Sequence, residues 1–176
     1  MVSVVSRNQW IAVAGAGPAM PVVAIAGWLA PSVRAHFALP ADDSGDRLAF
    51  ALKWLLVPGL ALLAGIVVAA RRGFIAGAIE GTRSPANYAL EINLRYNPNT
   101  IEQTLLAVVA WTGLALALPR EQLVVIPVLA TLFGVGRLTF WIGDLLHPLG
   151  RAFGMVLTAL PTVIAFGWLL VHALKS

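Results

Sequence analysis

Four polar side chains recur at helical spacing in a short stretch of otherwise apolar sequence, residues 91–102. They are Glu91, Arg95, Asn99 and Glu102. At about 100° per residue they fall within roughly 80° of one another around a helix. Guanidinium groups meet carboxylates through paired hydrogen bonds, so such a stripe could hold an anionic ligand. In lipid, the stripe must face protein or water.

A second set of charges follows further along the chain. Arg137 and Asp144 are seven residues apart and therefore share one helix face, and Arg151 stands seven residues further on. A charge at the centre of a membrane helix costs roughly 2.5–3.5 kcal/mol, so an unpaired one is a burden. We expect Arg137 to pair with Glu102 or Asp144.

The elements that must position these residues are membrane helices. Hydrophobic residues make up 59% of the 176 residues, charged residues only 11%, and the mean hydropathy is +0.84. These values predict an all-α integral membrane protein, because the apolar runs lack the short alternation of a β-barrel. The chain has no cysteine, and its net charge of +4 comes mostly from arginines near the ends of apolar runs. We therefore expect no disulfide, no metal site and no nucleic-acid binding.

Five apolar segments are expected, at residues 10–30, 48–70, 91–118, 123–142 and 152–174. The first is interrupted by glycines and prolines, and we expect a kinked span, or failing that an interfacial or re-entrant segment, rather than a cleaved signal peptide. Residues 31–47 are expected to be a loop. Pro98 should kink the third segment.

Antiparallel spans would bring the charges to one side of the membrane. Arg71 and Arg72 stand at the end of one span, and the polar stripe stands at the start of the next. Arg137, Asp144 and Arg151 lie near the connection between the last two spans. The density of arginine favours the cytoplasmic side. From spacing alone, a polar network that fixes helix register and a pocket for a small polyanionic ligand are equally good interpretations.

The pattern Glu-x3-Arg-x3-Asn-x2-Glu at 91–102 resembles the second-helix signature of the MAPEG family, the membrane-associated proteins of eicosanoid and glutathione metabolism. The basic close at Arg71 and Arg72 and the segment Gly136-Arg137 … Arg151-Ala-Phe-Gly154 are similar to further family segments. The resemblance implies a four-helix bundle at residues 48–176, to which residues 1–47 would be an addition, and a homotrimer. It also implies glutathione as cosubstrate.

In the family, the arginine matched by Arg151 stabilises the glutathione thiolate, and the one matched by Arg137 contacts glutathione. The resemblance extends binding roles to seven further residues. These are Arg71, Arg72, Glu91, Arg95, Asn99, Glu102 and Asp144. One departure stands out: related synthases carry tyrosines where this chain has Phe140 and Asp144.

Three functions stay open at this point. The first is a membrane glutathione transferase or peroxidase acting on a lipophilic electrophile, placed in a bacterial inner membrane with its site facing the cytoplasm. The second is a non-enzymatic protein of the same fold that has lost or altered the glutathione chemistry. The third is a small transporter or channel subunit that uses Arg137 and Asp144 as an ion relay.

Overall fold

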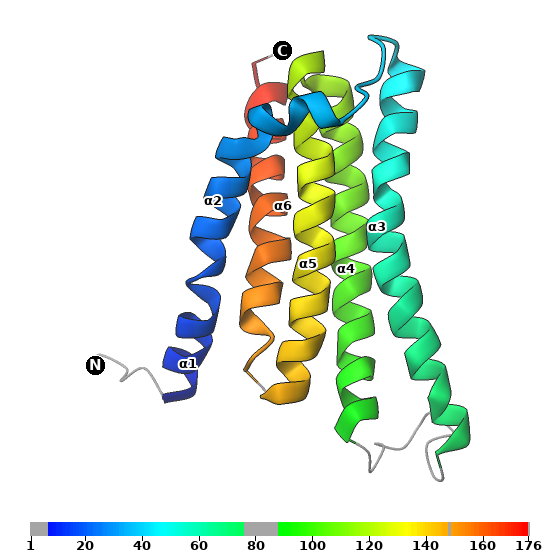
Figure 1. Cartoon of the computed structure of the whole chain (residues 1–176), viewed down its shortest axis with the longest axis vertical. Coiled ribbons are helices and arrows are strands. Elements are labelled where there is room, and N and C mark those ends of the chain that lie inside the picture. The colour runs from blue at the N-terminus through cyan, green and yellow to red at the C-terminus, as the bar shows by residue number, and fades with distance from the viewer. Residues whose placement is uncertain (1–6, 76–87, 148, 176) are drawn as a thin grey trace.

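The fold is seen in a computed structural model, which describes residues 7–75, 88–147 and 149–175. Long helices run side by side in a bundle, and no strand occurs among these residues (Figure 1). Within the described residues, five helical stretches are long and apolar enough to cross a membrane. The chain thus has the character of a multi-pass membrane protein with an all-α fold.

The helices are joined by short 3-10 turns that extend or link them. In chain order they are α1 (Arg7–Ala16), α2 (Ala19–Leu29), η1 (Ala30–His36), α3 (Ser44–Ala70), η2 (Arg71–Phe74), α4 (Tyr88–Ala117), η3 (Arg120–Val124), α5 (Val125–Leu146) and α6 (Ala152–Ala173). We call the end where α5 meets α6 the lower end, as it is drawn in Figure 1, and the end with η1 and η3 the upper end.

The N-terminal segment forms two helices instead of one. It breaks between α1 and α2 at Gly17 and Pro18, and the broken rod runs along α6 from the lower to the upper end (Figure 1). Proline cannot donate the backbone hydrogen bond that would continue α1, which explains the break. The arrangement agrees with the expected kinked span.

Two boundaries differ from those expected, whereas the third apolar segment forms the single helix expected for it. The presumed loop 31–47 begins with η1, in which Pro31 occupies the first turn, where its missing N–H has no partner to lose. The polar stretch and the apolar run after it form one helix, α4, which continues through Pro98. Helix α5 runs on to Leu146 and therefore includes Asp144.

At the upper end, side chains form hydrogen bonds with the free backbone groups at helix termini. The Asp43 carboxylate accepts hydrogen bonds from the N–H groups of Gly45 (2.7 Å) and Asp46 (3.3 Å) and so caps the start of α3. Arg47 donates to the Leu118 (2.7 Å) and Ala115 (3.2 Å) carbonyls, which the end of α4 leaves without helical partners.

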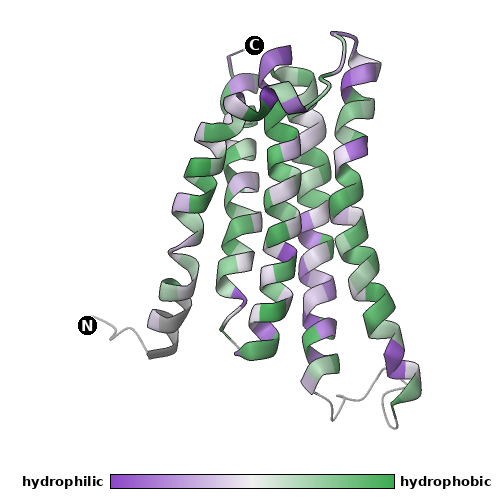
Figure 2. Ribbon diagram, in the orientation of Figure 1, coloured by the Kyte–Doolittle hydropathy of each residue, from purple (hydrophilic) through white to green (hydrophobic). Residues whose placement is uncertain are grey.

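The helices pack through an apolar core in the upper half and through close backbone contact in the lower half. Trp111 and Phe133 meet edge-to-face at 6.2 Å in the core. Lower down, a Cβ on Gly154 would collide with the backbone of Gly136 and Phe140, so α5 and α6 touch main chain to main chain. Figure 2 shows most hydrophilic residues of α4 in its lower half, beside this tight pair.

Candidate functional site

Arg137 is the centre of a hydrogen-bond network that joins three helices. Its guanidinium donates to Asn99 Oδ1 on α4 at 2.7 Å and to Thr158 Oγ1 on α6 at 2.8 Å. Thr158 in turn donates to the Gly154 carbonyl at 2.6 Å. The side chain is almost fully buried, at 1% exposure, and its Nε has no partner.

Aromatic faces complete the surroundings of this cation. The Arg137 Cζ lies 4.8 Å from the centroid of the Phe140 ring and 5.7 Å from that of Phe133. Cation–π contacts of this kind are worth about 2 kcal/mol or more when they are desolvated. A phenyl ring at position 140 thus supports the arginine without competing for its hydrogen-bond donors.

Asp144 is a buried carboxylate between two arginines from different helices. Its Oδ2 lies 3.9 Å from Arg95 Nε on α4 and 3.7 Å from Arg151 Nη1 at the start of α6. These separations are ion pairs rather than hydrogen bonds, and neither carboxylate oxygen has a hydrogen-bond partner although the side chain is 0% exposed. Both arginines are roughly one-third exposed.

The expected pairing of Arg137 was wrong. Neither Glu102 nor Asp144 lies within ion-pair distance of it, and its partners are a neutral amide and a hydroxyl. The sequence placed Asp144 on the same face of α5 as Arg137. However, a separation of seven residues along a helix corresponds to a rise of about 10 Å, which is too far for the two side chains to meet.

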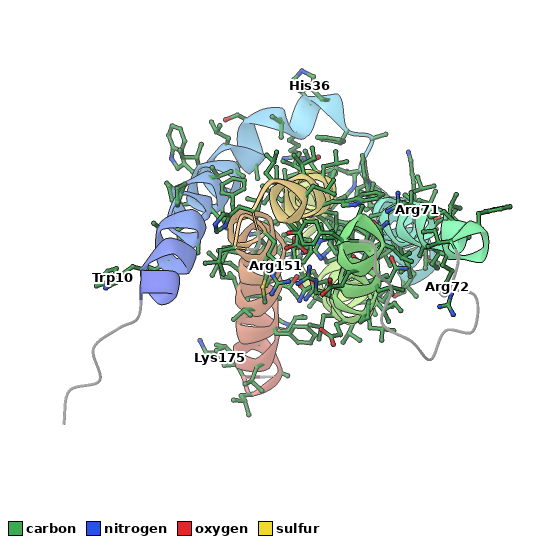
Figure 3. The ribbon with its side chains drawn as sticks, turned by 90° about the horizontal axis from the view of Figure 1, so that it is seen from below. Trp10, His36, Arg71, Arg72, Arg151 and Lys175 are labelled. Atoms are coloured by element: carbon green, nitrogen blue, oxygen red, sulfur yellow. The ribbon has the colours of Figure 1, made fainter. Side chains whose placement is uncertain are left out.

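The other predicted site residues divide into two groups. Asn99 contacts Arg137 and Arg95 faces Asp144, whereas Glu91 and Glu102 are exposed on this single chain. Figure 3 shows Arg151 near the middle of the lower end, with Arg71 and Arg72 off to one side at the end of α3. The structure therefore brings Asn99 to Arg137, and brings Arg95 and Arg151 to Asp144. We call these five residues the arginine cluster.

Sequence reasoning missed two residues of this site. Thr158 is buried at 2% exposure and contacts Arg137, and Tyr88 donates its hydroxyl to the backbone carbonyl of Asp144 at 3.2 Å. A signal for Thr158 was present, because it stands seven residues after Arg151 and so shares its face of α6. Tyr88 precedes the stripe by one turn and could have been added to it in the same way.

The arginine cluster is suited to binding an anion rather than to acid–base chemistry. It combines three guanidinium groups with one carboxylate, so its formal charge is +2. Helix α5 ends about 14 Å beyond Arg137, at a rise of about 1.5 Å per residue, so the network extends from the lower end into the bundle. Among the described residues, no group of three or more histidine, aspartate or glutamate side chains is placed to hold a metal ion.

Comparisons of the chain with protein-family models, with curated proteins and with solved structures found no match.

Proposed function

We propose that this protein is a membrane-embedded transferase or peroxidase that uses glutathione to attack a lipophilic electrophile. Arg137, Asn99 and Arg95 would hold the tripeptide, and Arg151 would stabilise its thiolate. The resemblance at residues 91–102 and 136–154 suggests this chemistry. The observation that carries it is Arg137, a buried cation that no carboxylate of the described residues neutralises.

Burying a cation of this kind lowers the stability of the folded protein, so its presence favours a functional role. Removing a charge from water costs several kcal/mol, and a buried charge is usually paired for that reason. Arg137 retains an unpartnered Nε–H next to a half-buried Asn99. Glutathione brings two carboxylates, which could complete this network through bidentate hydrogen bonds.

The transferase step would need only a positioned cation. The glutathione thiol loses its proton to water at the boundary, and the Arg151 guanidinium stabilises the thiolate that remains. The sulfur then forms a bond to the electrophilic carbon, and the electrons of the broken bond leave with the departing group. The partial exposure of Arg95 and Arg151 supports the proposal, because it would give the peptide a route from the aqueous side.

The charge of Asp144 supports a second candidate, a non-enzymatic protein of the same fold. Asp144 lies within 3.7 Å of Arg151, so the group proposed to stabilise a thiolate already faces a carboxylate. This negative charge would weaken glutathione binding. Under this alternative the cluster only fixes the register of α4, α5 and α6.

We further propose that the protein is a homotrimer in a bacterial inner membrane, with the arginine cluster facing the cytoplasm. Glu102 lies about 21 Å along α4 from Tyr88 and is exposed on a single chain. A carboxylate at that depth must be covered by protein or water. A neighbouring copy against the polar stripe of α4 would cover it, and the lipophilic electrophile would enter from the bilayer.

Calorimetric titration with glutathione in detergent tests the function directly. We expect binding by the wild type and by Lys175→Met, whose altered residue is exposed at the opposite end of α6. Arg137→Met should strongly weaken binding, and Arg151→Met should retain binding but lose conjugation of chlorodinitrobenzene. Absence of binding to the wild type would refute the glutathione proposal and leave the non-enzymatic candidate.

A further inference from the structure

A cavity lies away from the arginine cluster, between α2, α5 and α6. Its volume is about 550 Å³, and its lining includes Val23 and Gly27 on α2, Leu129 and Leu132 on α5, and Leu160 and Ile164 on α6. We call it the α2 slot. None of the nine candidate site residues lines it. The α5 residues that line it precede Arg137, so the slot occupies the upper part of the bundle.

The slot exists because the N-terminal segment touches the bundle at separate points. Ala19 and Val23 pack against Leu132 and Leu157, and η1 contacts η3 at the upper end. Between these contacts α2 presents small residues such as Ala24 and Gly27, and a Cβ built on Gly27 meets no heavy atom within 4 Å. The side chains of α2 thus leave the space unfilled.

The shape and chemistry of the slot restrict what can occupy it. Along α2 it extends from Met20 to Gly27, about 10 Å, and along α6 from Leu160 to Trp168, about 12 Å, so its long axis follows the helices. Nearly all its lining is apolar, and the amide of Gln122 lies at its upper end.

We propose that the α2 slot binds one acyl chain of a membrane lipid, with the polar head at the upper end near Gln122. The surrounding helices are of the length and composition that cross membranes, so the slot lies where acyl chains are the abundant solvent. Met20 and Ile164 on its rim are more than half exposed, which leaves a side entrance from the bilayer. The volume is within the range of about 300–1,000 Å³ found for small-molecule sites.

Photolabelling from the lipid phase tests this proposal. The full chain is reconstituted in phosphatidylcholine vesicles that carry a diazirine in the middle of one acyl chain, irradiated, and mapped by peptide mass spectrometry. We expect labels on Leu129 and Leu132, which are buried at 8% and 9% exposure but line the slot. Ile126 and Phe133 are also buried on α5, at 0% and 2% exposure, but lie outside the slot and should stay unlabelled.

Variants that fill the slot supply the second readout. Gly27→Leu should reduce labelling of Leu129 and Leu132 about tenfold, because displacing even two methylenes of a bound chain changes occupancy by that factor. Gly59→Leu is the matched control, since Gly59 is an exposed helical glycine on α3 that also has no atom within 4 Å of a Cβ. Ala24→Phe replaces Gly27→Leu if that variant does not fold. Wild-type labels restricted to exposed residues, or labelling of the slot that neither filling variant reduces, would overturn the proposal.

Discussion

Of the arginines in the described residues, Arg47 and Arg137 donate the most side-chain hydrogen bonds, Arg47 at the upper end of the bundle and Arg137 in its interior. Arg47 donates to main-chain carbonyls at the end of α4 and forms an ion pair with Asp42 at 2.7 Å. Each of these contacts holds two parts of the chain together. Arg137 donates to two side chains and keeps one buried Nε–H unused. The comparison suggests that Arg47 is kept for stability and Arg137 for a ligand.

Replacing each of these arginines by methionine should separate the two roles. Arg47→Met should lower the free energy of unfolding by about 1–3 kcal/mol, because it leaves carbonyl oxygens unpaired, and should not change glutathione binding. Arg137→Met should leave the free energy of unfolding unchanged or raise it, since an apolar group of similar length replaces a buried charge. It should weaken glutathione binding by about 1.5–3 kcal/mol or more. Chemical unfolding in detergent and calorimetry measure both, and a large loss of stability in Arg137→Met would assign it a structural role.

Asp144 sets the charge that Arg151 can offer to a thiolate. Asp144→Asn keeps the shape of the side chain and removes the carboxylate that lies 3.7 Å from Arg151. The freed guanidinium should stabilise the thiolate more strongly, so the pKa of the bound glutathione thiol should fall and the affinity should rise. A pH titration of the thiolate ultraviolet absorbance in the complex measures this.

An opposite result for Asp144→Asn would be equally informative. Weaker binding would mean that the carboxylate, whose two oxygens accept no hydrogen bond in the structure, receives the ammonium group of the peptide. Thr139→Val provides a control on the same helix, because the Thr139 hydroxyl only donates to α5 backbone carbonyls.

At the scale of whole elements, the pair α5–α6 determines the geometry of the cluster. Gly154 lies between Arg151 and Thr158, and a Cβ there would meet the main chain of Gly136 and Phe140. Any side chain at this position must push α6 away from α5. The distance between Arg137 and Arg151 therefore depends on the absence of a side chain at position 154.

Gly154→Ala should destabilise the protein by about 1–3 kcal/mol, because the backbone contact cannot adjust as a side-chain contact can. Gly167→Ala on the same helix, where a Cβ meets no atom within 4 Å, should instead be neutral or stabilising by up to about 1 kcal/mol. Thermal unfolding of the two variants in one detergent compares them. Equal midpoints would show that α5 and α6 are not in main-chain contact.

Hydropathy predicts where these elements lie but not how they are rotated. The five apolar segments appear as helices because length and composition alone specify a span. The end of α5 was less well predicted, since the polar Asp144 within this helix resembles the start of a loop. The partners of Arg137 and Asp144 were missed because they depend on the depth and rotation of α4 and α6, which only packing fixes.

At the scale of the whole molecule, the charges are divided unevenly between inside and outside. The arginine cluster is turned into the bundle, while Glu91 and Glu102 face away from it on α4. Gln103, next to Glu102, has a buried side-chain oxygen without a hydrogen bond. A single chain in lipid would therefore expose a carboxylate deep in a span.

Native mass spectrometry in mild detergent should show a homotrimer, in keeping with the resemblance and with the need to cover the polar stripe of α4. Glu102→Leu should reduce the trimeric fraction, because it removes a group that only protein or water can cover and lets α4 face lipid directly. Leu60→Ile is the control, because Leu60 is exposed on α3, and this variant should leave the trimer intact. A wild type that is monomeric at all detergent concentrations would contradict the trimer. Glu102 would then be hydrated within the bilayer, and the site would have to be complete in one chain.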